Sequence, residues 1–160
     1  MINVVLYEPE NPHNTGAIVR TCALLGAKLH LVKPYGFAGL DGDVRRSSMS
    51  YLDVVNVSEY DSWESFARVL PSPPRLFAFW DEGRCRHDEA DYADGDYLLF
   101  GRESVGLPDS ITAGYPTLTI AMPGIADVAR TDHRQHSLNL SVAVGIAVAE
   151  ANRVLKVRLL

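Results

Sequence analysis

The first 32 residues alternate between strand-like and helix-like patterns, and this limits the folds open to the chain. Ile2–Tyr7 (INVVLY) is a short apolar run rich in β-branched residues, and Leu29–Val32 (LHLV) is a second such run. Between them, a helix is expected to begin near Asn14, a good N-cap residue, and to stop at Gly26. Two strands joined by a crossover of this length run parallel. The unit therefore predicts a parallel sheet covered by helices.

The same alternation continues less regularly along the rest of the chain. There is no internal repeat and no linker that would divide it. We expect one α/β domain over residues 1–160, a mainly parallel sheet with helices on both faces. The further strands expected are Val54–Val57, Leu76–Trp80, Tyr97–Phe100 and Leu118–Met122, and the further helices are Gly42–Ser47, Ser62–Leu70, Asp109–Ala113 and Leu138–Leu155.

The composition is ordinary for a soluble globular protein, and we expect a cytosolic one. Apolar residues make up 47% of the chain and charged residues 22%, and no apolar run reaches the roughly 18 residues of a membrane span. The N-terminus lacks a basic region and a cleavage site, so no secretory signal is expected. Cys22 and Cys85 lie far apart and fit no metal spacing, which favours reduced thiols.

The net charge of −5 argues against general attraction to nucleic acid, which usually accompanies a basic balance. A local basic face remains open, because arginines occur in pairs at 45 and 46, 84 and 86, and 130 and 134. The simpler interpretation of any one pair is a solvated surface.

Several common motifs are absent, including the glycine-rich phosphate loops and the serine-hydrolase elbow. His133 and His136 are three residues apart beside Asp132, but no convincing third and fourth protein ligands accompany them. We therefore expect no metal.

Three polar segments fall where loops or helix starts are expected. NTGAIVR (Asn14–Arg20) is either a capped helix with a surface arginine or part of a site. FGRESVGLP (Phe100–Pro108) follows a strand, so it is either a ligand loop or a strand-to-helix turn. In HSLNLSVAVG, which ends at Gly145, helix capping accounts for one polar side chain but not for three.

Taken together and in this order, the three segments resemble the SPOUT superfamily of RNA methyltransferases. Within it, the chain is most similar to the small TrmL-like branch, whose members methylate the 2′-hydroxyl of the tRNA wobble nucleotide. The matching positions are Asn14, Gly16 and Arg20; Phe100, Gly101, Glu103, Gly106, Leu107 and Pro108; and Ser137, Asn139, Leu140 and Ser141.

The resemblance implies a C-terminal deep trefoil knot, a homodimer with the active site at its interface, and S-adenosylmethionine bound in the knot. The catalytic residues that it implies are Arg20, Asn14, Glu103 and Asn139. The cofactor-binding residues are Phe79, Gly101, Met122, Ser137, Gly106 and Leu138, and the candidate RNA contacts are Arg45, Arg46, Arg130 and Arg134. Arg20 matches the residue that the family uses to activate the ribose hydroxyl. Because guanidinium stays protonated, we expect it to stabilise the developing oxyanion and to position a phosphate.

Two departures from the branch bear on the substrate. GIADVARTDHRQH, between Pro123 and Ser137, is longer than usual and is expected to reach RNA, to cover the cofactor or to form only a surface loop. Ala149 stands where the branch often has tyrosine. The alternatives are a methyltransferase acting on ribosomal or other RNA, a non-catalytic RNA-binding protein with this fold, and an unrelated nucleotide-binding α/β protein.

Overall fold

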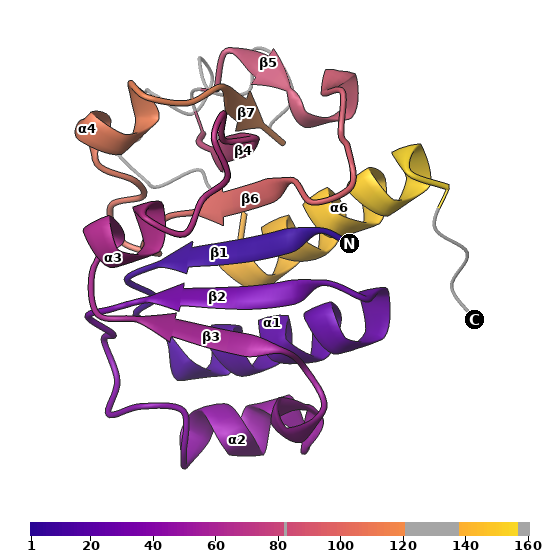
Figure 1. The fold of residues 1–160 in the computed structure, drawn as a ribbon. Coiled ribbons are helices and arrows are strands. Elements are labelled where there is room, and N and C mark those ends of the chain that lie inside the picture. The colour runs from indigo at the N-terminus through magenta and orange to yellow at the C-terminus, as the bar shows by residue number, and fades with distance from the viewer. Residues whose placement is uncertain (82, 121–137, 157–160) are drawn as a thin grey trace, which may run out of the picture.

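The computed structural model describes residues 1–81, 83–120 and 138–156. Its centre is a seven-stranded sheet in the order β3-β2-β1-β6-β4-β7-β5, and every strand pairing is parallel. The strands therefore end at one common edge, where the arrowheads of β1, β2, β3 and β6 lie in Figure 1. Their bounds are β1 Asn3–Tyr7, β2 Lys28–Val32, β3 Val57–Tyr60, β4 Leu76–Phe79, β5 Cys85–Arg86, β6 Tyr97–Phe100 and β7 Thr117–Thr119.

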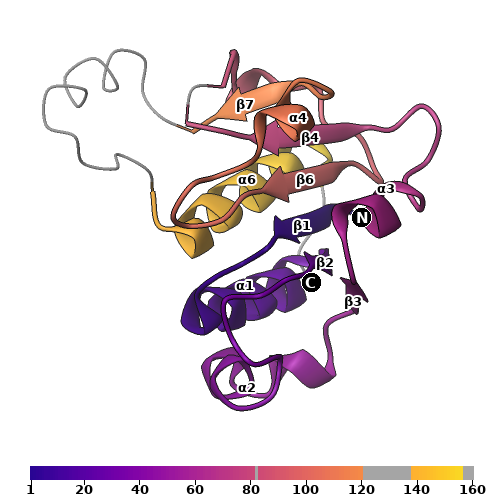
Figure 2. The ribbon, with the colours of Figure 1, turned by 90° about the vertical axis from the view of Figure 1, so that its left-hand side faces the viewer.

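Helices lie on both faces of this sheet. The helix bounds are α1 Pro12–Leu25, α2 Asp43–Ser48, α3 Trp63–Ala67, α4 Asp109–Thr112 and α6 Leu140–Val154, with short 3-10 turns η1 Tyr51–Asp53 and η2 His87–Glu89. Figures 1 and 2 show the two long helices, α1 and α6, on one face and the short α3 on the other. Helix α2 packs on the outside of α1.

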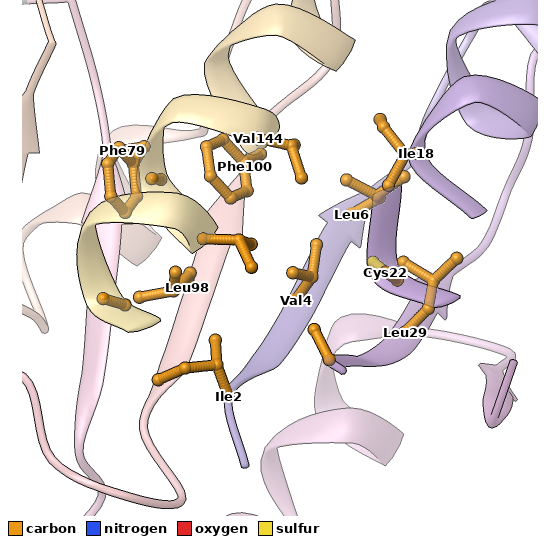
Figure 3. Packing of buried hydrophobic residues seen from close by; sticks show 14 of the residues in the cluster. Ile2, Val4, Leu6, Ile18, Cys22, Leu29, Phe79, Leu98, Phe100 and Val144 are labelled. Carbon is orange, nitrogen blue, oxygen red and sulfur yellow. The ribbon is translucent and has the colours of Figure 1, made fainter. Parts of the chain in front are cut away.

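Alternation along the strands divides the core into two clusters. Val4 and Leu6 of β1 join the cluster under α1 and α6, which also holds Ile18 and Val144 (Figure 3). Val5, between them in the chain, joins the opposite cluster with Phe66 of α3. Full burial of such a branched or aromatic side chain stabilises the fold by about 1.5–3 kcal/mol, so both faces of β1 hold the sheet to its helices.

Most of the expected elements are confirmed within a few residues, but two expectations are wrong. Helix α1 is capped by Asn11, whose side chain accepts from the amides of His13 and Asn14, so Asn14 lies inside the first turn. The expected strand at Val54–Val57 is instead an irregular segment between η1, which ends at Asp53, and β3, which begins at Val57. There, Val57 pairs with Leu29, whereas Val54 is 73% exposed.

The α/β class and the mainly parallel sheet are confirmed. The expected trefoil knot stays a prediction, because the segment between β7 and α6 lies largely within 121–137, outside the described residues. None of the helices in the described part of the chain is long and apolar enough to cross a membrane.

Candidate active site

The site is built where strands β1 and β6 end side by side. Leu6 pairs with Phe100, so the segments that follow the two strands leave the sheet at the same level. One is Glu8–Asn11, which leads into α1, and the other is Gly101–Leu107. Loops beyond the carboxyl ends of parallel strands are the usual ligand-binding position in α/β folds.

Glu103 ties these two segments together. Its carboxylate accepts from the backbone N–H of Glu10 at 2.8 Å and from that of Asn11 at 3.2 Å. One carboxylate thus satisfies two amides just before α1. These bonds fix the loop amides that come just before α1.

The side chain of Glu10 in turn binds the loop after β6. Its two carboxylate oxygens accept from Arg102 Nη2 at 2.9 Å, from the Ser104 amide at 2.8 Å and from Ser104 Oγ at 2.8 Å. The hydrogen bonds from Ser104, followed by the Arg102 charge, lower the pKa of the Glu10 carboxyl. The Glu10 carboxylate thus binds Arg102 and Ser104, and the Glu103 carboxylate binds the amides of residues 10 and 11. We call these reciprocal contacts the loop clasp.

Asn14 extends the clasp toward the C-terminal helix. Its Nδ2 donates to Glu103 Oε1 at 3.2 Å, and its Oδ1 accepts from Asn139 Nδ2 at 2.9 Å. Asn139 is in turn the N-cap of α6, where its Oδ1 accepts from the Ser141 amide at 2.9 Å and from Ser141 Oγ at 2.7 Å. One residue from each of the three polar segments therefore meets at this point, which we call the asparagine junction (Asn14, Glu103 and Asn139).

Arg20, the fourth expected catalytic residue, lies further along α1. No hydrogen bond or ion pair joins it to the asparagine junction. Its Nε is buried, and within the described part of the chain it has no hydrogen-bond partner. A buried guanidinium donor left unpaired is costly, so this side chain is suited to receive an oxygen acceptor from a bound molecule.

Two motif glycines are required by contacts within the chain. A Cβ on Gly16 would lie 2.4 Å from Ser47 Cβ of α2. The absence of a side chain at Gly16 therefore allows α2 to pack closely on α1. A Cβ on Gly101 would lie 2.2 Å from the carbonyl carbon of Gly106. Arg102 and Gly106 exchange both backbone hydrogen bonds, which folds this loop back on itself. These glycines are therefore needed for packing, whatever the loops also bind.

The expected cofactor residues fall into two groups. Phe79 and Phe100 end the neighbouring strands β4 and β6, and their rings stack with centroids 4.6 Å apart. The Phe79 ring belongs to the core, so only its backbone is at the ligand edge. Leu138 is 49% exposed just before α6, and Gly101 and Gly106 lie in the loop after β6, whereas Met122 and Ser137 lie outside the described residues.

The expected RNA contacts on α2 are held by acidic neighbours. Arg45 pairs with Asp53 at 2.8 Å and with Asp41 at 3.5 Å, and Arg46 pairs with Asp43. These carboxylates offset much of the positive charge that RNA would meet there. Arg130 and Arg134, the other two expected contacts, lie outside the described residues.

Glu10, Arg102 and Ser104 were not expected among the functional residues. The only signal for them in the sequence is their closeness to motif residues, Glu10 four positions before Asn14 and the other two beside Glu103. Among the described residues, no group of three or more histidine, cysteine, aspartate or glutamate side chains is placed to hold a metal ion, and His133 and His136 lie outside them.

This fold and these motifs define a known class. The SpoU rRNA methylase family matches residues 1–149, and the chain belongs to that family. The resemblance to SPOUT methyltransferases is thereby confirmed.

Curated relatives indicate which enzymes of this family the chain is similar to. The chain is 42% identical over 156 residues to the tRNA (cytidine(34)-2′-O)-methyltransferase of Escherichia coli strain K12, covering 97% of this chain and 94% of that protein. It is 41% identical over 160 residues to the enzyme of the same name from Yersinia pestis, with 97% and 94% covered.

Solved structures agree with these relatives. A structure described as giving insights into 2-OH methylation of C/U34 on tRNA matches with a TM-score of 0.89 and 44% identity, over 99% of this chain and 98% of that one. The SpoU methyltransferase AviRb from Streptomyces viridochromogenes, in complex with AdoMet, matches with a TM-score of 0.82 and 25% identity, over 97% of this chain and 58% of that one.

Proposed function

We propose that this chain is an S-adenosylmethionine-dependent methyltransferase that modifies the ribose 2′-hydroxyl at position 34 of tRNA. The observation that carries the proposal is the asparagine junction, in which Asn139 and Glu103 both bond to Asn14. It brings together the three segments whose residues match the family. The names of the full-length relatives and of the matching structure support the choice of tRNA position 34.

The residues of the chain have separate parts in this reaction. A ribose hydroxyl is a weak nucleophile unless its proton is removed or the charge on its oxygen is stabilised. Arg20 supplies fixed positive charge, and its Nε, which has no hydrogen-bond partner among the described residues, is available to donate to the ribose oxygen or to a neighbouring phosphate oxygen. Because guanidinium does not release its proton near neutral pH, Arg20 stabilises the developing charge and is not the base.

The cofactor fits the edge formed by the ends of β6, β4 and β7. These strands are neighbours in the sheet, and Phe79 pairs with both Phe100 and Leu118. Backbone groups after Phe79 and around Gly101 and Gly106 are the expected contacts, with Leu138, Met122 and Ser137 completing the set. Bound S-adenosylmethionine would supply the methyl group to the ribose oxygen, with S-adenosylhomocysteine as the leaving group and the hydroxyl proton passing to solvent. The asparagine junction keeps the surrounding loops in place.

The proposal also covers the location of the protein, its oligomeric state and its C-terminal knot. A tRNA substrate places the protein in the cytoplasm. A homodimer is supported by an exposed apolar stripe that begins just before α6 and continues along it. The stripe consists of Leu138, Val142 and Ile146, which are spaced four residues apart and are each at least 36% exposed. The knot and a role of residues 124–136 in covering the cofactor or reaching RNA belong to the same proposal.

Transfer of tritium from labelled S-adenosylmethionine to RNA tests this function. Bulk tRNA is expected to accept label, and mapping is expected to place it on the position 34 ribose. Arg20→Ala serves as the inactive control.

Methylation of ribosomal RNA is the second candidate, because the family carries that description and an rRNA methyltransferase from Sinorhizobium meliloti matches with a TM-score of 0.79 and 26% identity. Label found in ribosomal RNA and not in tRNA would favour it over the first.

A further inference from the structure

The loop after β2 carries two aromatic rings that have no part in the function proposed above. The rings of Tyr35 and Phe37 stack with centroids 5.1 Å apart and planes 15° from parallel. Both side chains are half-buried. Tyr35 packs against the core cluster under α1 and α6, whereas Phe37 belongs to neither of the two core clusters of the described residues. Phe37 is therefore the outer ring of the stack.

This loop lies directly against the candidate active site. The Gly36 amide, between the two rings, donates to the Pro9 carbonyl at 2.9 Å. A Cβ on Gly36 would lie only 2.7 Å from Glu10 Cα, so no larger residue fits there without a shift. Glu10 is also the residue whose amide binds Glu103. The loop that carries the aromatic stack and the asparagine junction thus contact the same short segment, through Gly36 and Glu103.

The inner ring is held in place before anything binds. Tyr35 Oη donates to Glu59 Oε2 at 2.7 Å, and burial together with this bond raises the pKa of the Tyr35 hydroxyl. With its hydroxyl engaged, Tyr35 presents a fixed surface for Phe37. A fixed platform loses little conformational entropy when a flat ligand is added to the stack.

The chemistry of the surroundings favours a nucleobase as that ligand. Carboxylates around this loop have cationic partners. Glu8 and Glu10 lie 3.6 Å and 2.9 Å from Arg102 nitrogens, and Glu59, which accepts from Tyr35, lies 4.0 Å from Lys33 Nζ, which offsets their repulsion of RNA. RNA-binding proteins stack unpaired bases on aromatic side chains, because each base offers a π surface whatever its hydrogen-bonding edge. We propose that Phe37, backed by Tyr35, is a stacking platform for an unpaired base next to the ribose that is methylated.

This proposal rests on the proposed function, because it assigns how that site holds its single-stranded RNA. The test uses an anticodon stem-loop RNA with 2-aminopurine in the loop, whose fluorescence falls when the base stacks. Binding to the full chain is followed by fluorescence and by anisotropy in the presence of S-adenosylmethionine. Phe37→Leu keeps an apolar side chain but removes the ring, and Phe37→Tyr keeps the ring.

We expect Phe37→Leu to weaken RNA binding by roughly tenfold or more and to abolish the loss of 2-aminopurine fluorescence. Phe37→Tyr is expected to stay near wild type, as is Val69→Ala, an exposed control beside α3. Cofactor affinity and the thermal midpoint are expected to be unchanged in all three, which separates the platform from a structural role.

Two results would overturn the platform: wild-type RNA binding by folded Phe37→Leu, or an equal loss in Phe37→Tyr. If Phe37→Leu does not fold, Phe37→Met replaces it under the same criterion. Methyl transfer to bulk tRNA by the wild-type protein is measured in parallel. Its absence would count against the proposed function, while the fluorescence and anisotropy would still decide the platform.

Discussion

Asn139 Nδ2 donates a hydrogen bond of 2.9 Å to Asn14 Oδ1, although 125 residues separate the two in the chain. The same Asn14 side chain donates to Glu103, so its amide is engaged at both ends. A change at Asn14 therefore affects the loop after β6 and the start of α6 together. This coupling leads to the first prediction.

Asn14→Ala and Asn139→Ala are each expected to lower kcat by about a hundredfold, because a small displacement of reacting groups costs that much. The double variant should lose little more than either single variant, since both remove the same contact. Kinetics of the four proteins in a double-mutant cycle provide the measurement. Asn56→Ala, an exposed asparagine before β3, is the matched control. Additive losses would show that the two asparagines act independently.

Arg20→Ala is expected to abolish methylation and to leave the affinity for S-adenosylmethionine nearly intact. The reason is that Arg20 Nε, which no described residue pairs with, is assigned to the RNA oxygen and not to the cofactor. Calorimetry with the cofactor and tritium transfer to tRNA give the two readings. Arg68→Ala removes an exposed arginine at the end of α3 and should keep activity. Full activity in Arg20→Ala would contradict the mechanism.

The loop clasp predicts a matched pair of stability changes. Glu10→Gln leaves one oxygen to accept from Arg102 and Ser104, and we expect unfolding to become easier by about 1–2 kcal/mol. Arg102→Ala should cost less than Glu10→Gln, because the Ser104 bonds to Glu10 survive. Urea unfolding at neutral pH measures both, with exposed Glu89→Gln as a control. A larger loss of stability in Arg102→Ala than in Glu10→Gln would show that the arginine charge contributes more than the serine hydrogen bonds.

The sequence predicts strands and long helices well, because their periodicity is local. Its failures occur where two local signals compete. Asn11 and Asn14 are both good caps, and Pro12 in the first turn of α1 decides for Asn11. The valines from 54 to 57 look like a strand, but only from Val57 onward is the chain aligned with β2.

The sequence motifs identify the site residues but do not predict which residues they bond to. Three motifs in order identify Asn14, Glu103 and Asn139, yet the bonds among them depend on the β1–β6 register and on where α6 begins. The partners of Glu10 could not be predicted, since Arg102 and Ser104 carry no pattern that points to a residue 92 or 94 positions away. Long-range polar contacts of this kind have no periodic signal in the sequence.

A buried histidine predicts how stability depends on pH. His30 lies among Tyr60, Phe66 and Tyr97, and burial, followed by the charge of Lys28, lowers the pKa of its imidazole from 6.5 to about 4. The unfolded chain thus binds more protons than the folded one between these values. The free energy of unfolding should fall as the pH drops from 6.5 toward 4, by roughly 3 kcal/mol at most from this group.

His30→Gln isolates that contribution. The neutral ring bonds to Asn3 Oδ1 at 3.2 Å and to the Tyr60 hydroxyl at 3.0 Å, and glutamine is able to form similar bonds without titrating. Urea unfolding at several pH values should show a shallower decline for His30→Gln than for wild type in this window. Parallel curves for the two proteins would show that His30 does not govern the dependence.

The exposed stripe on α6 predicts the interface of the proposed homodimer. Val142 and Ile146 are 49% and 36% exposed on a helix that buries Leu140, Val144 and Val148. Ile146→Glu places a charge on this stripe, where burial between two copies would be strongly unfavourable. We expect the variant to be a folded monomer by light scattering coupled to size exclusion, with activity reduced because the site is proposed to lie at the interface. Val54→Glu, at a more exposed apolar position after η1, should remain dimeric. A dimer in Ile146→Glu that matches wild type in stability would place the interface elsewhere on the molecule.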